Sequence, residues 1–596
     1  MRSGSETSMT YQAPVDDIVF ALKTAAGLDD LLQRGLYVGL DADTIGAVIE
    51  EAGKFGAEVL APLNASGDKV GSKFTDSAVT TPPGFRDAYR QFAEGGWSSL
   101  PCAETFGGQG LPQIVSAAVG EIWNASNVSF GLCPLLTQGA IHAIEAGSSD
   151  AIKAKYLPKM VAGTWTGTMN LTEPHAGSDL GPLSTRAEPQ SDGTYRITGT
   201  KIFITYGEHD MAENIIHLVL ARLPNAPAGT RGISLFLVPK FLVHDDGSLG
   251  GRNDVVCAGI EHKLGIMASP TCVMKFGEKG GATGYLIGEE NRGLATMFVM
   301  MNAARLGVGL QGVGVAERAT QQAIAYARER RQGKSFTHNG SGASPIIEHA
   351  DVRRMLLTMK AMTQAARMIC FATARELDIA HLSNVDAERK AALDKAALLT
   401  PLAKAFSTDI ANEVASLGIQ VHGGMGFIEE TGAAQYLRDA RILPIYEGTN
   451  GIQAIDLVTR KLPLQGGAVV ASYLAELADV IASVRVSNRP EFGSMAQRLT
   501  EALTGLQCAT LWMGLNLKSK PEAAHASATP YLRLMSLTAG GTYLAKGALS
   551  EDAASPRVAV ARFFAENLLT EAAGLAESVQ NGADSVLIDA HGALFA

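Results

Sequence analysis

The sequence predicts an α+β protein, in which a β domain follows an N-terminal helical domain and precedes a C-terminal helical bundle with an appended helical domain. Apolar residues recur at helical spacing at first, short β-branched stretches separated by turns come next, and helical spacing then returns. The chain has 596 residues, which is enough for several domains. We expect these domains at residues 9–162, 163–290, 291–461 and 462–596.

The first two segments differ in the period of their apolar residues. Ile45, Val48 and Ile49 repeat at helical spacing, which predicts a helical domain. In the second segment, 202–205 and 233–238 are short runs of Ile, Phe, Leu and Val, and Asp-Gly and Pro-rich turns lie between such runs. This second pattern predicts a β domain.

The second half of the chain has the composition of long helices. Stretches rich in Ala, Leu, Met, Glu and Arg at 316–330, 352–380 and 387–417 predict a helical bundle. The run Leu-Pro-Leu-Gln-Gly-Gly at 462–467 interrupts this pattern. The remainder is again helical in pattern, so we expect it to form the appended domain.

Composition argues against several classes of partner. Charged residues make up 18% of the chain and the net charge is −10, so no strong positive field would attract a nucleic acid. The six cysteines and the histidines lack the spacing of a metal site or of a disulfide framework. We therefore expect that the protein binds neither a metal nor a nucleic acid and that it resides in a reducing cytoplasm.

Neither end of the sequence predicts a targeting signal. Residues 1–9 lack an apolar core and are interpreted as an addition before a natural start at Met9. The last residues, 593–596, are not a peroxisomal Ser-Lys-Leu address. No apolar run reaches the roughly 18 residues needed to span a bilayer, so we expect no membrane span and a soluble protein.

Two glycine-containing motifs match nucleotide sites but lie in the wrong context. The run 307–312 has the spacing of a dinucleotide fingerprint, yet it follows a helical stretch rather than a strand. Close helix packing through small residues is the favoured interpretation. Residues 333–335 resemble the end of a P-loop, but Arg328 stands where its first glycine is required.

The strongest candidate for catalysis is Glu447, in the run Leu-Pro-Ile-Tyr-Glu-Gly-Thr-Asn-Gly at 443–451. Its apolar neighbours Leu443, Ile445 and Tyr446 would remove water from the carboxylate, and desolvation raises a carboxyl pKa towards the range of a general base. A solvated turn before a glycine is the alternative, because Asp and Glu are common there.

Three further segments resemble the acyl-CoA dehydrogenase family, over about residues 15–460. The first is Met-Asn-Leu-Thr-Glu-Pro-His-Ala-Gly-Ser-Asp at 169–179, which resembles the family's flavin loop. The resemblance implies FAD contacts from the following residues of this loop: Met169, Leu171, Thr172, Gly177 and Ser178. It also implies the family's fold, with a middle β-barrel or sandwich domain and a C-terminal four-helix bundle.

The second segment is Lys-Ile-Phe-Ile-Thr at 201–205. The family usually has an aromatic residue, a spacer and a Thr or Ser against the flavin. The resemblance therefore implies that Phe203 packs on the isoalloxazine ring and that Thr205 hydrogen-bonds near it. By itself, the run is a plain β-strand with Phe203 in the core.

The third segment is a pair that resembles the family's clamp for the FAD of the neighbouring subunit. In 326–333 the resemblance implies contacts from Arg330, which would pair with phosphate, and from Gln332. The family's usual Phe-Gly is reduced here to a glycine, so the aromatic contact is missing or is supplied by a residue such as Phe336. Gln-Val-His-Gly-Gly-Met-Gly at 420–426 is the second half of the clamp. The contacts implied there come from Gln420, Gly423 and Gly424.

The resemblance also assigns the base and its surroundings. Glu447 is the catalytic base, and Thr449 contributes a hydroxyl to FAD. The implied substrate contacts are Ser178, Arg305, Tyr446 and Gly448. Asn302 stands where the family has an Asp in the element that contains Arg305, and either of these residues could instead pair within the bundle.

The reaction that the resemblance implies is α,β-desaturation of an acyl-CoA thioester, with Glu447 removing the α proton and FAD accepting the β hydrogen. The chain resembles the long subgroup of the family that acts on 3-methylmercaptopropionyl-CoA, in dimethylsulfoniopropionate degradation. The resemblance lies in its length and in the segments 346–355 and 446–453. A medium- or long-chain fatty acyl-CoA is the close alternative, and an oxidase that uses oxygen is another. An electron-transferring flavoprotein as acceptor and a homodimer are also implied.

A DNA-binding flavoprotein of the alkylation-response type is the alternative from another class. Such relatives bind DNA through a basic C-terminal domain. Here acids outnumber bases after residue 462, which disfavours DNA binding.

Overall fold

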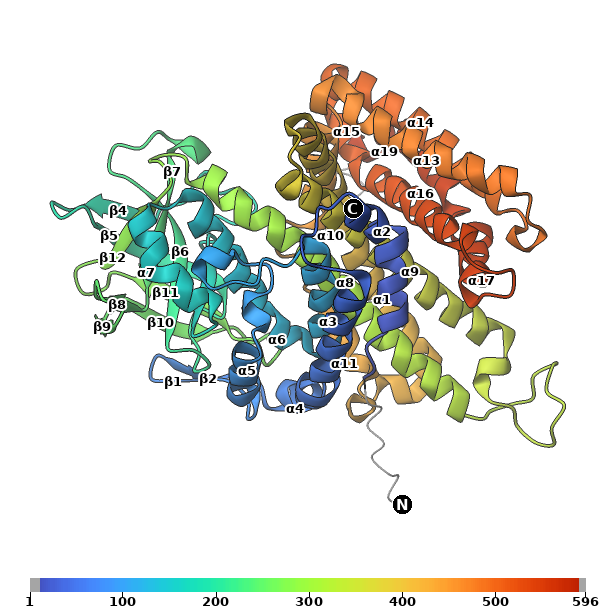
Figure 1. Cartoon of the computed structure of the whole chain (residues 1–596), viewed down its shortest axis with the longest axis horizontal. Helices are drawn as coiled ribbons and strands as arrows, with labels where there is room; N and C mark the ends of the chain where they lie inside the picture. Colours follow the sequence, from blue (N-terminus) through green and yellow to red (C-terminus); the bar gives the residue numbers. More distant parts are fainter. Residues whose placement is uncertain (1–10, 589–596) are drawn as a thin grey trace. The chain divides into compact units, whose positions relative to one another are not determined.

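The computed structural model describes residues 11–588, so the interpretation of residues 1–9 as an addition lies outside the described residues. The chain divides into two compact units. One unit comprises Met1–Gly53, Gln113–Ala125 and Val308–Ala596, and the other comprises Lys54–Pro112 and Ser126–Gly307. We call them the helical unit and the β unit, and Figure 1 shows their elements coloured along the sequence.

The β unit contains all the strands that the structure describes. Its strands are β1 (Lys73–Thr75), β2 (Ala78–Thr80), β3 (Trp165–Asn170), β4 (Arg186–Pro189), β5 (Tyr195–Thr205), β6 (Asn214–Arg222), β7 (Ile233–Pro239), β8 (Phe241–Val243), β9 (Leu249–Arg252), β10 (Val255–Ile260), β11 (Thr271–Phe276) and β12 (Ala282–Ile287). Its helices are α4 (Pro62–Val70), α5 (Phe85–Glu94) and α7 (Asp150–Val161). Helices α3 (Ala42–Phe55), α6 (Gln113–Gly147) and α8 (Gly293–Glu329) contribute residues to both units.

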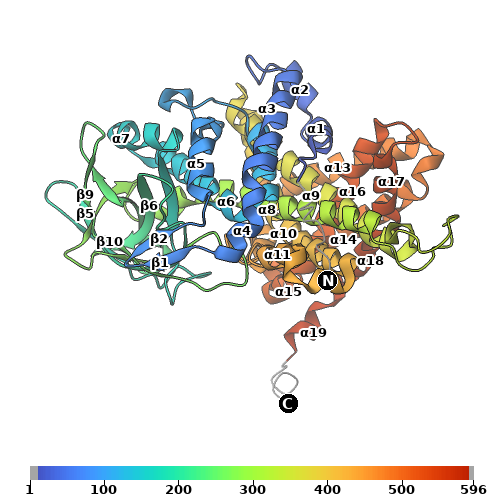
Figure 2. The same ribbon diagram turned by 90° about the horizontal axis from the view of Figure 1, so that it is seen from below.

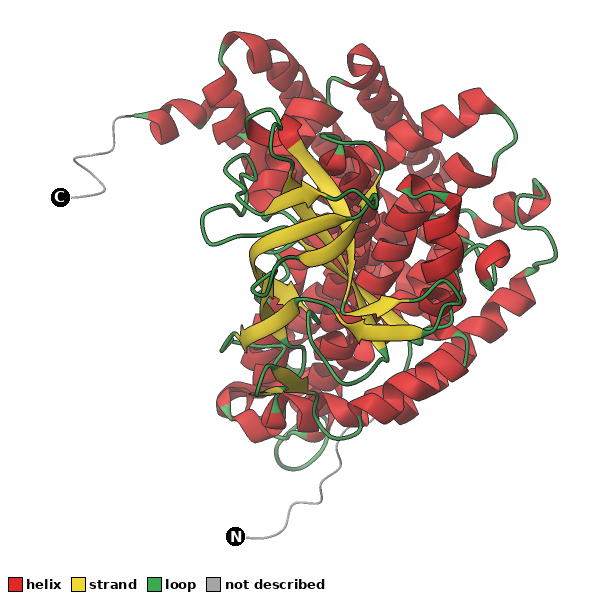
Figure 3. Ribbon diagram, turned by 90° about the vertical axis from the view of Figure 1, so that its left-hand side faces the viewer, coloured by secondary structure: helices red, strands yellow, loops and turns green. Residues whose placement is uncertain are grey.

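The main sheet has eight strands, with the order β10-β11-β5-β12-β7-β6-β3 and with β4 paired to β5 and β6. Figure 3 shows these strands in yellow. Strands β6 and β7 read as near-continuous apolar runs because both of their faces are buried. Strand β3 lies at one end of this order and pairs in parallel with β6, from Trp165 opposite Asn214 onwards. The loop that leaves β3 is the predicted flavin loop.

The helical unit is built from long helices, as the sequence predicts. Its elements are α1 (Val15–Thr24), α2 (Leu28–Gln33), α9 (Ala350–Leu382), α10 (Asp386–His422), α11 (Ala433–Ala440), α12 (Asn450–Asp456), α13 (Ala468–Ser487), α14 (Met495–Ser519), α15 (Pro521–Ala526), α16 (Ala528–Leu549), α17 (Pro556–Phe563), α18 (Glu571–Asn581) and α19 (Ala583–Leu587). Helices α13, α14 and α16 of the appended segment pack side by side (Figures 1 and 2).

A buried ion network lies inside the helical unit. The Arg367 guanidinium on α9 donates to Glu121 of α6 at 2.6 Å and to Glu317 of α8 at 2.8 Å, and all three side chains are buried. Burial raises the pKa of Glu121, whereas the cations Lys360 and Arg367 outweigh burial and lower the pKa of Glu317. Loss of one member would leave an unpaired charge in the core.

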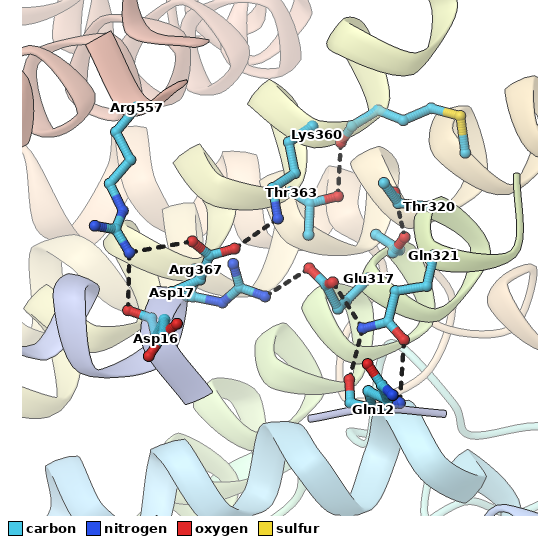
Figure 4. Close-up of polar contacts among 12 residues, drawn as sticks. Gln12, Asp16, Asp17, Glu317, Thr320, Gln321, Lys360, Thr363, Arg367 and Arg557 are labelled. Carbon is cyan, nitrogen blue, oxygen red and sulfur yellow. Dashed lines mark hydrogen bonds and ion pairs between the residues drawn. The ribbon is translucent and has the colours of Figure 1, made fainter. Parts of the chain in front are cut away.

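The network extends to both ends of the chain, as Figure 4 shows. Asp17 of α1 accepts a hydrogen bond from Lys360 of α9 at 2.6 Å, and Arg557 of α17 lies 3.6 Å from its carboxylate. Arg557 also donates to the backbone oxygen of Asp16 at 3.2 Å. The appended segment is thereby tied to the N-terminal helix within this unit.

The glycines of the 307–312 run lie within helix α8. A Cβ at Gly309 would come within 2.6 Å of the Ala403 oxygen, and one at Gly312 within 2.4 Å of the Ser407 oxygen. These glycines therefore allow α8 and α10 to approach closely, which confirms the helix-packing interpretation.

Two helical stretches are long and apolar enough to cross a membrane, which corrects the expectation that no such stretch exists. They are Gly293–Glu329 and Leu464–Ser487, and 56% and 33% of their apolar windows are buried inside the structure. Core helices of soluble proteins pass the same test of length and composition.

Candidate functional site

The predicted flavin loop is tied to strand β5 by a fully buried ion pair. Lys201 on β5 donates to the Glu173 carboxylate at 2.9 Å and to the Leu171 oxygen at 3.0 Å. The Ile202 N–H donates to the Thr172 oxygen at 2.9 Å. The β unit therefore brings two of the predicted flavin segments, 169–178 and 201–205, together.

The Glu173 carboxylate has several donors besides Lys201. Ser184 and Thr185 each donate a backbone N–H and a hydroxyl to it. Burial alone would raise its pKa, but Lys201 and these hydroxyls outweigh burial and lower the pKa of Glu173 to about 2. Burial lowers the pKa of Lys201 to about 8 against the opposing effect of Glu173. The geometry of the pair indicates that both groups are charged near neutral pH.

Phe203 has a backbone conformation that the sequence did not predict. Its φ is +60° and its side chain is 59% exposed, so it is not the core residue of a plain strand. The register against β11 shifts here, because Ile204 pairs with Cys272 whereas Lys201 pairs with Met274. This β-bulge places one extra residue in β5 and turns Phe203 outward. A bulky residue at positive φ is strained, and such strain concentrates at functional sites.

The remaining flavin-loop residues lie at the surface or close to it. Gly177 and Ser178 are exposed, whereas Met169, Leu171 and Thr172 are half-buried. Thr205 is half-buried as well, and its backbone oxygen accepts a hydrogen bond from the Thr168 hydroxyl at 2.7 Å.

The first half of the predicted clamp follows helix α8. Arg330 and Gln332 are both exposed, and the Gln332 oxygen accepts a hydrogen bond from His349 at 2.8 Å. The loop closes on itself, since the Ser344 N–H donates to the Gly333 oxygen at 2.9 Å. Phe336 in this loop is fully exposed, and no other aromatic residue follows Arg330 before the loop ends.

The second half of the clamp lies at the end of α10. Gln420, Gly423 and Gly424 are exposed, and a Cβ added at either glycine would meet no atom within 4 Å. Tyr326 stacks on His422 with ring centroids 4.4 Å apart, so the helical unit brings the two predicted halves of the clamp together.

Glu447 lies in a tight turn between α11 and α12, and it too has a positive φ, of +56°. The Asn450 N–H donates to the Pro444 oxygen at 2.9 Å and closes the turn. Leu443 is buried, but Ile445 is 48% exposed. The Oε2 atom of the Glu447 carboxylate is itself buried, although Ile445 faces solvent.

The neighbours of Glu447 are held by polar contacts. The Tyr446 hydroxyl donates to the Gln311 amide oxygen on α8, and burial raises the pKa of Tyr446, with the Glu447 carboxylate adding to the effect. The Gly448 oxygen accepts a hydrogen bond from the Lys404 ammonium. The Thr449 hydroxyl accepts from the Ile452 N–H at 3.3 Å and caps α12.

Sequence reasoning missed the residues that fix this turn. Lys404 on α10 is fully buried and donates to the Gly448 oxygen at 2.9 Å, and Gln453 donates to the Glu447 oxygen at 3.2 Å. A lysine in an Ala-rich helix is usually solvated. The available signal was the run 398–406, which is mostly apolar and has no charged residue other than Lys404.

Arg305, the predicted CoA contact, is buried in α8, with its guanidinium 6.0 Å from the centre of the Phe298 ring. The side chain of Asn302 is outside the described part of the structure. Within residues 11–588, no group of three His, Cys, Asp or Glu residues is arranged to hold a metal.

Family models for acyl-CoA dehydrogenases match most of the chain. The N-terminal, middle and C-terminal domain models match residues 43–164, 168–278 and 291–462, and a model described as "Acetyl-CoA dehydrogenase C-terminal like" matches 473–588. The chain belongs to the acyl-CoA dehydrogenase family. It is therefore a flavin-dependent oxidoreductase that acts on CH–CH bonds of acyl-CoA substrates, in a family of soluble enzymes that use FAD.

Several relatives align with nearly the full length of this dehydrogenase. The 3-methylmercaptopropionyl-CoA dehydrogenase of Ruegeria pomeroyi is 47% identical over 97% of this chain and 99% of its own. A butyryl-CoA dehydrogenase of Syntrophomonas wolfei is 35% identical over 97% of this chain and 98% of its own. The solved structure of Caenorhabditis elegans ACDH-11 with C11-CoA covers 99% of this chain and 98% of its own, with a TM-score of 0.76 and 20% identity. This likeness confirms the predicted fold, including the appended helical domain.

The residues of the dehydrogenase fit FAD. An exposed aromatic side chain at a strand bulge, Phe203, suits a flat ring system. The open backbone at Gly423 and Gly424 and the exposed guanidinium of Arg330 suit a pyrophosphate and its sugars.

Proposed function

We propose that the dehydrogenase oxidises 3-methylmercaptopropionyl-CoA to methylthioacryloyl-CoA, as a cytoplasmic enzyme of dimethylsulfoniopropionate degradation. The observation that carries this proposal is the 47% identity to the Ruegeria pomeroyi enzyme over nearly the full length of both chains. The four domains of the proposal are 9–162, 163–290, 291–461 and 462–596.

In this proposal Glu447 is the general base. The thioester carbonyl makes the α proton acidic, and Glu447 removes that proton while its backbone N–H donates to the thioester oxygen. The turn supports this role, because the backbone of Glu447 has a positive φ and is held there by hydrogen bonds to the carbonyl oxygens of Glu447 and Gly448. FAD, when bound, supplies the electron acceptor for the β hydrogen. Ser178, Arg305, Tyr446 and Gly448 bind the substrate.

The residues proposed to hold FAD come from five segments. They are Met169, Leu171, Thr172, Gly177, Ser178, Phe203, Thr205, Arg330, Gln332, Gln420, Gly423, Gly424 and Thr449. The segments at 330–332 and 420–424 serve the FAD of the neighbouring subunit in a homodimer. Exposed apolar side chains near these segments, Phe336, Met425 and Phe427, favour burial against a second copy. Reduced FAD passes its electrons to an electron-transferring flavoprotein.

A fatty acyl-CoA is the second candidate substrate, and the full-length similarity to a butyryl-CoA dehydrogenase favours it. One or two methylene groups change pocket affinity only modestly, so such relatives can share most site residues. DNA binding is not supported by the match of residues 473–588 to a dehydrogenase-derived model.

The test is anaerobic bleaching of the flavin of the purified holoenzyme, at about 450 nm. The substrates are 3-methylmercaptopropionyl-CoA, butyryl-CoA and palmitoyl-CoA, and the Glu447→Gln variant is the control. The proposal predicts the highest kcat/KM with the first thioester. Faster bleaching by butyryl-CoA or palmitoyl-CoA would contradict the substrate, and no bleaching by any thioester would contradict the function.

A further inference from the structure

Lys404 is a buried cation that the proposed chemistry does not use. It lies on α10 with none of its surface exposed, and its ammonium donates to the Gly448 oxygen at 2.9 Å and to the Asn450 side-chain oxygen at 2.8 Å. An ammonium is buried at high cost unless its donors are satisfied. Both acceptors are within three residues of Glu447.

Asn450 extends this contact into a small network. Its amide donates to the Ala405 oxygen at 3.1 Å, to the Thr408 hydroxyl at 2.9 Å and to the Asp409 carboxylate at 2.7 Å. Lys404 and Asn450 thus join one face of α10 to the start of α12. The peptide that follows Glu447 cannot rotate without breaking these bonds.

Glu447 needs such support because of its backbone conformation. Its φ of +56° is disfavoured for a residue with a Cβ, and such conformations persist only where the surroundings over-determine them. Gln453 holds the carbonyl of Glu447 at 3.2 Å, and Lys404 holds the carbonyl of Gly448. Gln311 holds the Tyr446 hydroxyl from α8.

We infer that Lys404 is a positioning residue for the catalytic carboxylate, which it orients by clamping the backbone on the C-terminal side of Glu447. This inference rests on the proposed role of Glu447 as the base. Lys404 itself touches neither substrate nor cofactor in this assignment.

Lys404 also acts on a carboxylate beside the turn. Burial raises the pKa of Asp409, whose carboxylate accepts from the Asn450 amide, whereas the cations Arg533 and Lys404 act in the opposite direction. Removal of Lys404 would therefore weaken the network that holds Asn450 as well as the bond to the Gly448 oxygen.

The test is the Lys404→Met variant of the holoenzyme, with Lys395→Met as the matched control. Lys395 lies on the same helix, is also largely covered and pairs with Glu376 and Glu476 away from the turn. The rate of flavin reduction at saturating acyl-CoA, KM, FAD content and thermal stability are measured for both. We expect Lys404→Met to lower the rate at least tenfold, with KM and FAD content little changed, because the base is misplaced while the binding residues stay in position.

The controls separate positioning from folding. Lys395→Met should keep the wild-type rate, and Lys404→Arg, which keeps a cation with donors, should retain most of it. If Lys404→Met does not fold, Lys404→Gln carries the same expectation for the rate and KM. A folded, FAD-loaded Lys404→Met or Lys404→Gln enzyme with the wild-type rate would overturn the inference. Loss of folding or of FAD in both variants would also overturn it, because the role of Lys404 would then be structural. If the wild-type flavin is not bleached by any acyl-CoA, the proposed function itself fails, which is a different result.

Discussion

Phe203 in the β unit and Glu447 in the helical unit share a disfavoured backbone conformation, but they are held in it by different means. Phe203 lies in a bulge of a strand whose neighbours are fixed by the sheet and by the buried Lys201–Glu173 pair. Glu447 lies outside any helix or strand, in a turn that is fixed by side-chain hydrogen bonds.

This difference indicates what each region can tolerate. A sheet fixes the backbone through many repeated bonds, so the Phe203 side chain can change without loss of the bulge. A turn held by a few side chains depends on each of them. We therefore expect changes around Glu447 to act mainly on rate, and changes around Phe203 to act mainly on stability and on FAD affinity.

The largest expected effect is on chemistry. The Glu447→Gln variant keeps the shape of the side chain but removes the base, so flavin reduction by acyl-CoA should slow by about 10²- to 10⁴-fold while FAD stays bound. Stopped-flow absorbance measures this rate. The Glu522→Gln variant, at an exposed acid on α15 away from the turn, is the control and should react at the wild-type rate.

Breaking the ion pair behind the flavin loop should have the next largest effect. In the Lys201→Met variant the Glu173 carboxylate stays buried without its cation, which should cost about 3–5 kcal/mol of unfolding free energy. Lys275→Met on β11 removes an exposed pair with Glu278 and should cost less than about 1 kcal/mol. Equal losses in urea denaturation would show that the buried pair has no special role.

The same pair gives a pH dependence. Because the pKa of Glu173 is about 2 in the folded protein, below its ordinary value, its contribution is fully present above its unfolded pKa. That contribution is lost as pH falls through the unfolded pKa towards about 2. The urea midpoint should therefore drop more steeply between pH 5 and pH 3 for wild type than for Glu173→Gln. Equal slopes of urea midpoint against pH for wild type and Glu173→Gln would contradict a stabilising role of the ionised Glu173.

Relief of the strain at Phe203 should have two smaller effects of opposite sign, one on the stability of the apoprotein and one on FAD affinity. Phe203→Gly removes the Cβ at positive φ, so the apoprotein should gain up to about 1 kcal/mol, while the loss of the ring should weaken FAD binding about tenfold. Phe74→Gly, on the exposed hairpin strand β1, is the matched control and should only destabilise. Calorimetry and FAD titration separate the two effects.

The smallest expected effect is at the helix cap. Thr449→Ala removes the acceptor for the Ile452 N–H at the start of α12, which should cost about 1 kcal/mol in the apoprotein. Thr449→Ser keeps the hydroxyl and should be close to wild type. Thermal unfolding of wild type, Thr449→Ala and Thr449→Ser measures this loss, and equal stability of all three proteins would contradict the role of the cap.

Much of the fold could be predicted from the sequence. Helices α9 and α10 extend the predicted stretches 352–380 and 387–417 by a few residues only, because residues of high helix propensity such as Ala, Leu, Met, Glu and Arg dominate both stretches. The stretch 202–205, expected as a short strand of its own, is the end of the longer strand β5, Tyr195–Thr205.

The conformation of the site residues could not be predicted in the same way. Nothing in Lys-Ile-Phe-Ile-Thr signals that Phe203 takes a positive φ, because local preference favours an extended strand and the bulge arises from pairing with β11. Lys404 looked like a surface lysine, because its acceptors lie more than forty residues further along the chain. Contacts between distant segments decide both cases.

The central claim is that Glu447 removes the α proton of the thioester, and its most direct test is hydrogen exchange. The holoenzyme, with its FAD reduced by dithionite, is incubated with 3-methylmercaptopropionyl-CoA in D₂O, and deuterium at the α carbon is followed by mass spectrometry. Since oxidation is blocked, incorporation reports the base alone. We predict exchange by the wild type and none above background by Glu447→Gln. Exchange by the variant at the wild-type rate would contradict the account.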